Sequence, residues 1–229
     1  MRKLRIRHKP WARGELEQCG FFVADAVSCK GKWKSMFENP DAPFQIELGC
    51  GKGGFMSELA ARNPGINYLA VDMKDDMLGL AKRKIVKSYT EKNMLSDGKV
   101  KNVLLTPYDI ERIDSVLDEN DTASRIYINF CNPWPRKKQN KKRLTHTRQL
   151  LKYRNFLETG GEIRFKTDDD ELFKDSIGYF KESGFEIKFL TYDLHGENIA
   201  DNIVTEHENM FSEQGIKIKY LIAVKIQKD

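Results

Sequence analysis

The stretch that decides the fold is residues 44–54, FQIELGCGKGG, in which a short apolar run leads directly into a glycine-rich turn. The run Phe44–Leu48 follows Pro43 and predicts a buried strand, and residues 55–62 after the turn predict a helix. Glycines at such a turn let the backbone approach a ligand closely. The stretch therefore predicts the opening strand, turn and helix of an α/β sheet that binds a ligand at this edge.

Strands and helices are expected to alternate along the rest of the chain. In segment 75–91, the apolar residues Met77, Ala81 and Ile85 recur at the spacing of one helix face. Such alternation indicates an α/β fold with a doubly wound, mostly parallel, seven-stranded sheet and helices on both faces, as in Rossmann-like domains. The remaining strands are expected at 68–71, 100–105, 125–130, 162–166, 185–191 and 218–226, and the remaining helices at 113–117, 145–157 and 172–182.

The length and the distribution of charge limit the number of domains and the kinds of ligand that we expect. A chain of 229 residues suits one α/β domain, and we expect a basic arm at 1–13 followed by a single domain at 14–229. Residues 1–13 hold six Lys/Arg and no acid, and residues 131–157 hold nine Lys/Arg and no acid. The other residues hold 24 basic side chains against 34 acidic ones. A negative body with two basic segments is typical of a protein that binds a polyanion such as nucleic acid.

Neither a membrane span nor a metal site is expected. No apolar run approaches the ~20 residues that a span needs, and no apolar stretch typical of a secretory signal follows the basic N-terminus. We therefore expect a cytoplasmic protein. Cys19, Cys29, Cys50 and Cys131 show no C-x-x-C spacing and histidines are few, so we expect neither a metal site nor a disulfide framework. The sequence leaves the oligomeric state open.

Three acidic residues stand where the expected strands end. Glu47 lies two residues before Gly49, Asp72 ends the second strand, and Asp109 follows the third. A dinucleotide is the obvious ligand of a G-x-G turn, but the Glu47 carboxylate would repel its pyrophosphate and suits the cationic amino-acid part of S-adenosylmethionine. Asp72 stands near the ~20-residue offset at which an acid binds ribose hydroxyls, and Asp109 is placed to accept from an adenine amino group. The pattern favours S-adenosylmethionine as the cofactor.

The segment after the fourth expected strand carries the most specific motif. Residues 128–145 read INFCNPWPRKKQNKKRLT. This segment resembles the signature of the bacterial tRNA (guanine-N7-)-methyltransferases, the TrmB family, whose usual pattern is Asp-Pro-Trp-Pro/His-Lys before a basic run. Other segments resemble, in order, the N-terminal arm, cofactor loop, Thr-Asp pair and late Thr-x-x-Glu element of that family: RHKPWA at 7–12, ELGCGKG at 47–53, Thr167-Asp168 and TEHE at 205–208.

The resemblance, which covers nearly the whole chain, implies a class I methyltransferase fold and a specific activity. It implies transfer of a methyl group from S-adenosylmethionine to N7 of a guanine in tRNA, which we expect to be the variable-loop guanine. The tRNA would bind through the basic segments 1–13 and 136–148. The implied cofactor-binding residues are Glu47, Gly49, Gly51, Asp72, Asp109 and Asn132, with Asn132 in the catalytic position, and the implied substrate-binding residues are Arg136, Asp168, Thr205, Glu206, His207 and Glu208.

The chemistry of guanine N7 agrees with this set of residues. N7 carries a lone pair and no proton, so its methylation needs in-line positioning and no prior deprotonation. The product ring is cationic, and the carboxylates of Asp168 and Glu208 would stabilise it. A buried base must leave its stack to reach the pocket, and Trp134 or Trp11 would supply a face on which it stacks.

Two departures from the family pattern keep alternatives open. Asn132 replaces the Asp, and Lys138-Gln139 replaces Arg-His. The first departure suggests, as one alternative, an RNA-binding relative with weak or lost catalysis. The second alternative is an amino-group methyltransferase, because Asn132-Pro133-Trp134-Pro135 is close to the [Asn/Asp]-Pro-Pro-aromatic tetrad of those enzymes. The basic run that follows this tetrad fits RNA better.

Overall fold

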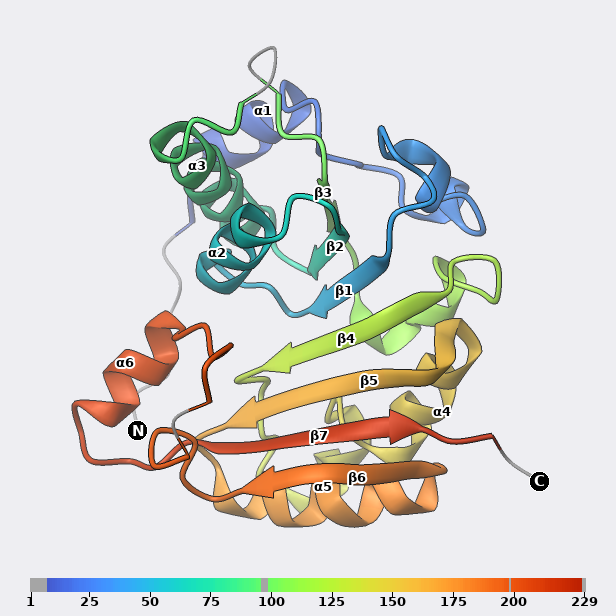
Figure 1. Cartoon of the computed structure of the whole chain (residues 1–229), viewed down its shortest axis with the longest axis vertical. Coiled ribbons are helices and arrows are strands. Elements are labelled where there is room, and N and C mark those ends of the chain that lie inside the picture. The colour runs from blue at the N-terminus through green and yellow to red at the C-terminus, as the bar shows by residue number, and fades with distance from the viewer. Residues whose placement is uncertain (1–7, 96–98, 198, 228–229) are drawn as a thin grey trace.

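The chain folds around one seven-stranded sheet (Figure 1). The computed structural model describes residues 8–95, 99–197 and 199–227. The strands lie in the order β3-β2-β1-β4-β5-β7-β6. Their bounds are β1 Phe44–Leu48, β2 Asn67–Asp72, β3 Val103–Pro107, β4 Ala123–Asn129, β5 Leu157–Thr167, β6 Phe185–Thr191 and β7 Lys219–Lys225.

The sheet is mixed because one strand opposes the others. β1 to β5 pair in parallel, whereas β7 pairs antiparallel with both β5 and β6. The predicted doubly wound, mostly parallel sheet of seven strands is therefore confirmed, with β7 as its single reversed strand. The strand order reverses between β1 and β4, since the chain runs outward from β1 to β3 and then returns to start β4. Ligands of doubly wound sheets bind at such a point, beyond the carboxyl ends of the strands.

Helices cover the two faces of the sheet, and a short one stands at its edge (Figure 1). One face carries α1, α2 and α3, and the other carries α4 and α5, while α6 lies where the parallel strands end. The bounds are α1 Trp11–Glu17, α2 Gly54–Arg62, α3 Asp75–Glu91, α4 Thr147–Phe156, α5 Asp170–Glu182 and α6 Glu206–Ser212, with 3-10 helices η1 Val27–Cys29, η2 Lys34–Met36, η3 Ile110–Ser115 and η4 Lys137–Lys142. None of the described helices is both long and apolar enough to cross a membrane.

The start of the chain joins the body through α1. Gly79 of α3 allows the two helices to approach closely, because a Cβ at this position would lie 2.8 Å from the Cβ of Ala12. Arg83 of α3 stacks over the Trp11 ring at 3.5 Å from its centroid. Residues 1–7 of the expected arm lie outside the described residues, and α1 begins within the last part of 1–13. The division into an arm and one domain stays a prediction.

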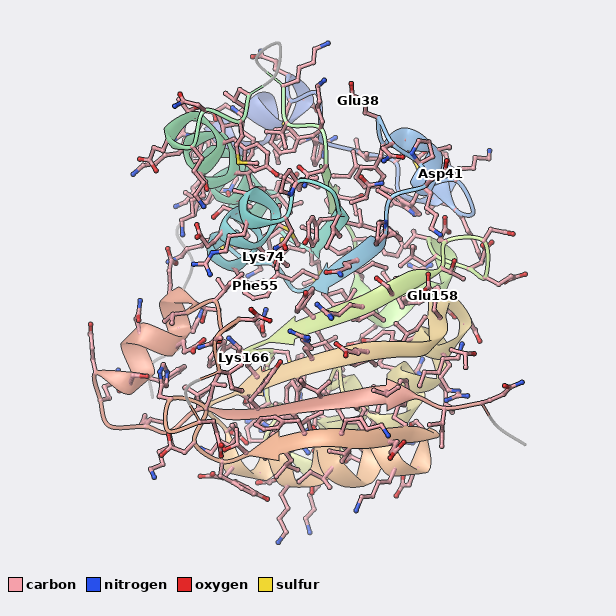
Figure 2. The ribbon with its side chains drawn as sticks, in the orientation of Figure 1. Glu38, Asp41, Phe55, Lys74, Glu158 and Lys166 are labelled. Atoms are coloured by element: carbon pink, nitrogen blue, oxygen red, sulfur yellow. The ribbon has the colours of Figure 1, made fainter. Side chains whose placement is uncertain are left out.

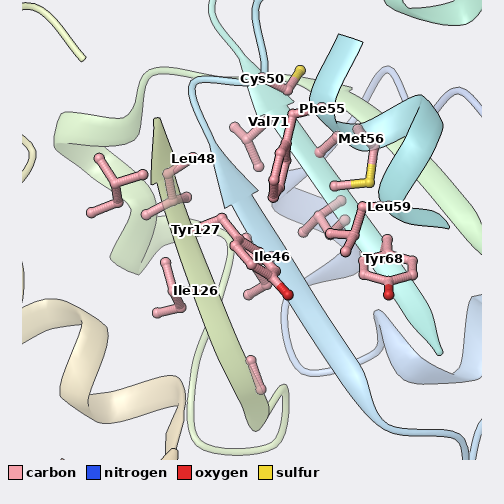
Figure 3. Packing of buried hydrophobic residues seen from close by; sticks show 14 of the residues in the cluster. Ile46, Leu48, Cys50, Phe55, Met56, Leu59, Tyr68, Val71, Ile126 and Tyr127 are labelled. Atoms are coloured by element: carbon pink, nitrogen blue, oxygen red, sulfur yellow. The ribbon is translucent and has the colours of Figure 1, made fainter. Parts of the chain in front are cut away.

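The core lies on both faces of the sheet. All five residues of β1 are buried, as expected for a central strand that is covered on both sides. Phe55 of α2 packs edge-on against Tyr127 of β4, with ring centroids 5.0 Å apart (Figure 3). In the segment before β1, Trp33 is fully buried and its Nε1 donates to the carbonyl of Val116 at 2.7 Å. Burial of each large apolar side chain contributes roughly 1.5–3 kcal/mol.

We expect alanine substitutions at Gly51 and Gly53 of the glycine turn to differ clearly in how much they lower the free energy of unfolding. Gly51 and Gly53 both have a positive φ, of 52° and 72°, so alanine at either position costs roughly 1–2 kcal/mol of backbone strain. A Cβ on Gly53 would also lie 2.6 Å from the Cα and Cβ of Ala81, whereas one on Gly51 meets no described atom within 4 Å. Gly53→Ala should therefore lower the free energy of unfolding by roughly 1–3 kcal/mol more than Gly51→Ala. Urea unfolding measures both, and equal losses would contradict the packing argument.

Candidate active site

A cavity of about 680 Å³ lies at the point where the strand order reverses. Its volume is within the range of roughly 300–1,000 Å³ that small-ligand pockets occupy. The walls come from the ends of β1, β2 and β4, from the segments that follow β3 and β4, and from the start of α6. The structure brings most of the expected site residues to these walls: Glu47, Gly49, Gly51, Asp72, Asp109, Asn132, Thr205, Glu206 and His207.

The glycine turn is fixed to the end of β2 by backbone hydrogen bonds. Gly49 and Cys50 donate their N–H groups to the carbonyl of Val71, at 2.9 and 3.0 Å. Gly51 N–H donates to one carboxylate oxygen of Asp72 at 2.9 Å, and Lys74 N–H donates to the other at 3.0 Å. These bonds hold the Asp72 carboxylate in a single orientation. Burial raises the pKa of this carboxyl group. Asp72 therefore both closes the turn and presents a fixed acceptor to the cavity.

Glu47 is a buried carboxyl group, and only one of its two oxygens accepts a hydrogen bond from the described residues. Its Oε1 accepts from the side-chain amide of Asn129 at 3.2 Å. Its Oε2 is buried and has no hydrogen-bond partner among the residues that the structure describes. Burial raises the pKa of Glu47 to about 7. A buried acceptor without a partner is costly, so a cationic or hydrogen-bonding ligand in this cavity would satisfy it.

Asp109 and its neighbours form a more apolar part of the wall. Asp109 caps η3, because its Oδ1 accepts from the N–H of Glu111 at 3.0 Å. Met73 also lines the cavity, and 64% of it is exposed to solvent. Tyr108 lies on the same wall. Met73 and Tyr108 are not among the site residues expected from the sequence. Their positions directly beside Asp72 and Asp109 in the sequence could have indicated them.

The loop after β4 holds Asn132 in a constrained backbone. The Oδ1 of Asn132 accepts from the N–H of Trp134 at 3.1 Å. Phe130 and Trp134 have positive φ values of 52° and 44°, which non-glycine residues rarely adopt. Strain of this kind costs roughly 1–3 kcal/mol per residue and gathers at functional sites. Asn132 is exposed and lines the cavity, so the loop presents its amide to a bound molecule.

Arg143 anchors this loop to the body of the protein. It is fully buried, and its Nε donates to the carbonyl of Pro133 at 2.7 Å. Its two terminal nitrogens contact Asp175 at 2.5 Å and Glu171 at 3.2 Å, both on α5. The expected basic surface 136–148 therefore needs a correction at this position, since Arg143 faces inward. Exposed cations of that segment do remain, and they include Arg136, Lys137, Lys138, Lys141, Lys142 and Arg148.

Glu208 has a role different from the one expected for it. It is fully buried, and its Oε2 accepts from the Lys166 ammonium at 3.0 Å. Oε1 accepts from Asn202 at 2.8 Å. Thr205 and Glu208 also form a capping box, in which the Thr205 hydroxyl accepts from the N–H of Glu208 at 3.0 Å. These contacts engage both carboxylate oxygens in fixing the start of α6, and Glu208 does not line the cavity.

The other expected substrate residues lie around the rim. Glu206 pairs with Lys84 of α3 and approaches Lys52 of the glycine turn at 3.8 Å. His207 stacks on Phe130, with ring centroids 5.7 Å apart. Asp168 follows β5 and is partly buried, which raises its pKa, and it does not line the cavity. Arg136 is exposed and also lies outside the cavity lining.

The two tryptophans proposed as stacking faces occupy different places. Trp134 lines the cavity, and the Lys142 ammonium lies 5.1 Å from its ring centroid. Trp11 is packed on α3 beneath the Arg83 guanidinium and is not part of the cavity wall. A base that enters the cavity would therefore meet Trp134.

Comparison with known proteins identifies relatives of the whole chain. A family model described as "Putative methyltransferase" matches residues 41–221. The chain is 59% identical to the tRNA (guanine-N(7)-)-methyltransferase of Clostridium perfringens, over 97% of this chain and 100% of that protein. It is 52% identical to the enzyme of the same name from Acetivibrio thermocellus, over 97% of this chain and 100% of the relative.

Solved structures support the fold. The 16S rRNA methyltransferase KamB superposes with a TM-score of 0.57 at 13% identity, over 98% of this chain and 97% of that one. An antibiotic-related methyltransferase gives a TM-score of 0.56 at 15% identity, over 97% and 96%. At these identities the likeness concerns the fold alone, and it confirms the expected methyltransferase fold. The sequence identities to the tRNA enzymes carry the assignment further: the chain belongs to the TrmB family of bacterial tRNA (guanine-N7-)-methyltransferases.

Proposed function

We propose that this protein, like the relatives named above, transfers a methyl group from S-adenosylmethionine to N7 of a guanine in tRNA. The observation that carries the proposal is that Glu47, Asp72 and Asp109 line the same cavity as Asn132. A cationic cofactor suits a cavity with several carboxylates, whereas the pyrophosphate of a dinucleotide would meet the buried Glu47. The placement of the guanine in the variable loop and the cytoplasmic location belong to the same proposal.

The cavity residues offer partners for the ammonium group, the ribose and the adenine ring of S-adenosylmethionine. The unpartnered Oε2 of Glu47 would receive the cofactor's ammonium group. Asp72, fixed by Gly51 and Lys74, would accept from the ribose hydroxyls. Asp109 and the exposed Met73 would hold the adenine ring. The cofactor supplies a methyl group on a positively charged sulfur, and the protein has to bring guanine N7 in line with it.

Positioning and electrostatics suffice for this transfer. Guanine N7 has a lone pair and carries no proton, so no residue would need to remove a proton before the transfer. Asn132 would orient the guanine or the cofactor through its exposed amide, and Trp134 would stack on the base. Asp168 lies just after β5 and outside the cavity lining, so its charge would act on the positive ring at longer range. Glu208 would act indirectly, by holding Thr205 and the start of α6 in place.

Glu47 makes cofactor binding dependent on pH. Its pKa of about 7 means that it is mostly neutral at pH 6 and mostly ionised at pH 7.5. Only the ionised form attracts an ammonium group, so the affinity for S-adenosylmethionine should rise several-fold between these two values. Calorimetry would measure the rise. Glu47→Gln should bind more weakly and show a flat profile, and an equal rise in that variant would remove Glu47 from the site.

The activity of a variant at Asn132 distinguishes the catalytic proposal from the alternative of an RNA-binding protein without turnover. An aspartate at this position retains the oxygen that accepts from Trp134 and adds a negative charge facing the developing cation. Asn132→Asp should therefore raise kcat, by up to about 100-fold, with little change in tRNA affinity. The assay is methyl transfer to unmodified tRNA, with the product mapped by strand cleavage at N7-methylguanine.

The same assay distinguishes the alternatives. Activity of the natural protein at N7 supports the proposal. If only the Asn132→Asp variant is active, the RNA-binding relative without turnover becomes the better description. Methylation at an exocyclic amino group would instead support the amino-group methyltransferase. If neither the Asp nor the Ala variant differs from the natural protein, Asn132 has no catalytic role.

The exposed lysines of η4 should carry part of the tRNA affinity. Each lost phosphate contact reduces the slope of log affinity against log salt by about 1. Replacing Lys137, Lys138, Lys141 and Lys142 by Gln should therefore flatten the slope by up to about four. A matched control removes four exposed lysines elsewhere: Lys87, Lys174, Lys181 and Lys188. Equal slopes for the two variants would mean that η4 does not contact the RNA.

A further inference from the structure

A second cavity, of about 320 Å³, lies next to the active site on the face of β4 and β5 that α4 and α5 leave open (Figure 1). Phe55 and Asn129 belong to the walls of both cavities. Figure 2 shows Phe55 and Lys166 between α2 and the ends of β4 and β5, and the Lys166 ammonium lies 5.9 Å from the Phe55 ring centroid. The mechanism proposed above makes no use of this space.

Two arginines from neighbouring strands share one carboxylate at this cavity. Arg125 of β4 and Arg164 of β5 each donate through Nε to the same oxygen of Glu162, at 2.9 and 3.1 Å. One terminal nitrogen of Arg125 donates to the Tyr127 hydroxyl at 3.2 Å. Within the described part of the chain, the other terminal nitrogen of Arg125 and both of those of Arg164 have no hydrogen-bond partner. The cluster therefore carries one surplus positive charge and unused donors.

The other charged groups of the cavity do not cancel this surplus. Lys166 is paired with Glu208 at 3.0 Å, and Arg62 is paired with Glu58 at 2.6 Å. Asp201 is the acid that lines the cavity, and it is exposed, so water screens its charge more than that of the arginines. The side chains of Arg125 and Arg164 are only 27% and 22% exposed. An anion in the cavity would thus meet partly desolvated guanidinium groups.

The planar donors of arginine match phosphate oxygens in geometry and charge. Leu59 and Ile203 add apolar wall on which a sugar or base can rest. The volume is at the small end of the range for ligand pockets, which suits one nucleotide and not a helical segment. We propose that this cavity is a second binding site, which takes the phosphate group of a nucleotide through Arg125 and Arg164. The phosphate belongs either to the RNA backbone or to a free nucleotide.

The first test observes the two arginines directly. In the full-length protein, the side-chain Nε–Hε signals of Arg125 and Arg164 are assigned by NMR through the variants Arg125→Gln and Arg164→Gln. Titration with inorganic phosphate and with guanosine 5′-monophosphate should shift both signals, and guanosine without phosphate should not. The proposal is overturned if neither phosphate compound moves either signal. This readout measures binding and is independent of methyl transfer, so its failure leaves the proposed function standing.

The second test identifies the source of the phosphate. Arg164→Lys keeps the charge and removes the planar donors, and Lys188→Gln removes an exposed charge outside the cavity as a control. If the RNA backbone is the ligand, Arg164→Gln weakens tRNA binding about 10-fold, Arg164→Lys also weakens it, and the control has little effect. If a free nucleotide is the ligand, only the affinity for guanosine 5′-monophosphate falls.

Glu162→Gln should change phosphate affinity in the direction opposite to the arginine variants. It removes the carboxylate that the two arginines share, so phosphate affinity should rise in a variant that thermal unfolding shows to be folded. Folded Arg125 and Arg164 variants that bind tRNA, phosphate and nucleotide as tightly as the natural protein would overturn the proposal.

Discussion

The active site depends on the pair of hydrogen bonds that Asp72 accepts from the backbone of Gly51 and Lys74. The bond from Gly51 joins the turn after β1 to the end of β2, and the bond from Lys74 fixes the carboxylate to the segment that follows β2. They fix the positive-φ turn that starts α2, and α2 in turn packs on β4 through Phe55. One carboxylate therefore helps to hold the glycine turn to the end of β2, and it also lines the cavity in which we propose that the cofactor binds.

The strands and the acids at their ends could be predicted because both follow from local patterns. Phe44–Leu48 and the glycines after it specify a strand and a turn, and parallel strand ends meet at one edge, so Glu47 and Asp72 had to lie close together. The reversed direction of β7 could not be predicted, because an apolar strand has the same pattern in either direction. It became evident only from its pairing with β5 and β6.

Roles that depend on contacts between distant segments were harder to predict. Glu208 belongs to a segment that resembles a substrate-binding element, yet its oxygens are engaged by Lys166 and Asn202. The Arg125–Glu162–Arg164 cluster requires the register that places Arg125 beside Glu162 on the neighbouring strand. Neither fact is encoded in local composition. The sequence identifies which residues are available, and the register decides whether a charge serves a ligand or the fold.

The buried position of Arg143 has a consequence for how the basic run tolerates change over evolution. By charge alone, Arg143 and its lysine neighbours look equivalent. Arg143, however, uses separate nitrogens to bind Pro133, Asp175 and Glu171 at once, and lysine cannot reproduce that planar arrangement. An exchange of arginine for lysine would thus disrupt the loop at this position. Within one basic run, Arg143 thus maintains the architecture of the loop, whereas we propose that its exposed neighbours contact RNA.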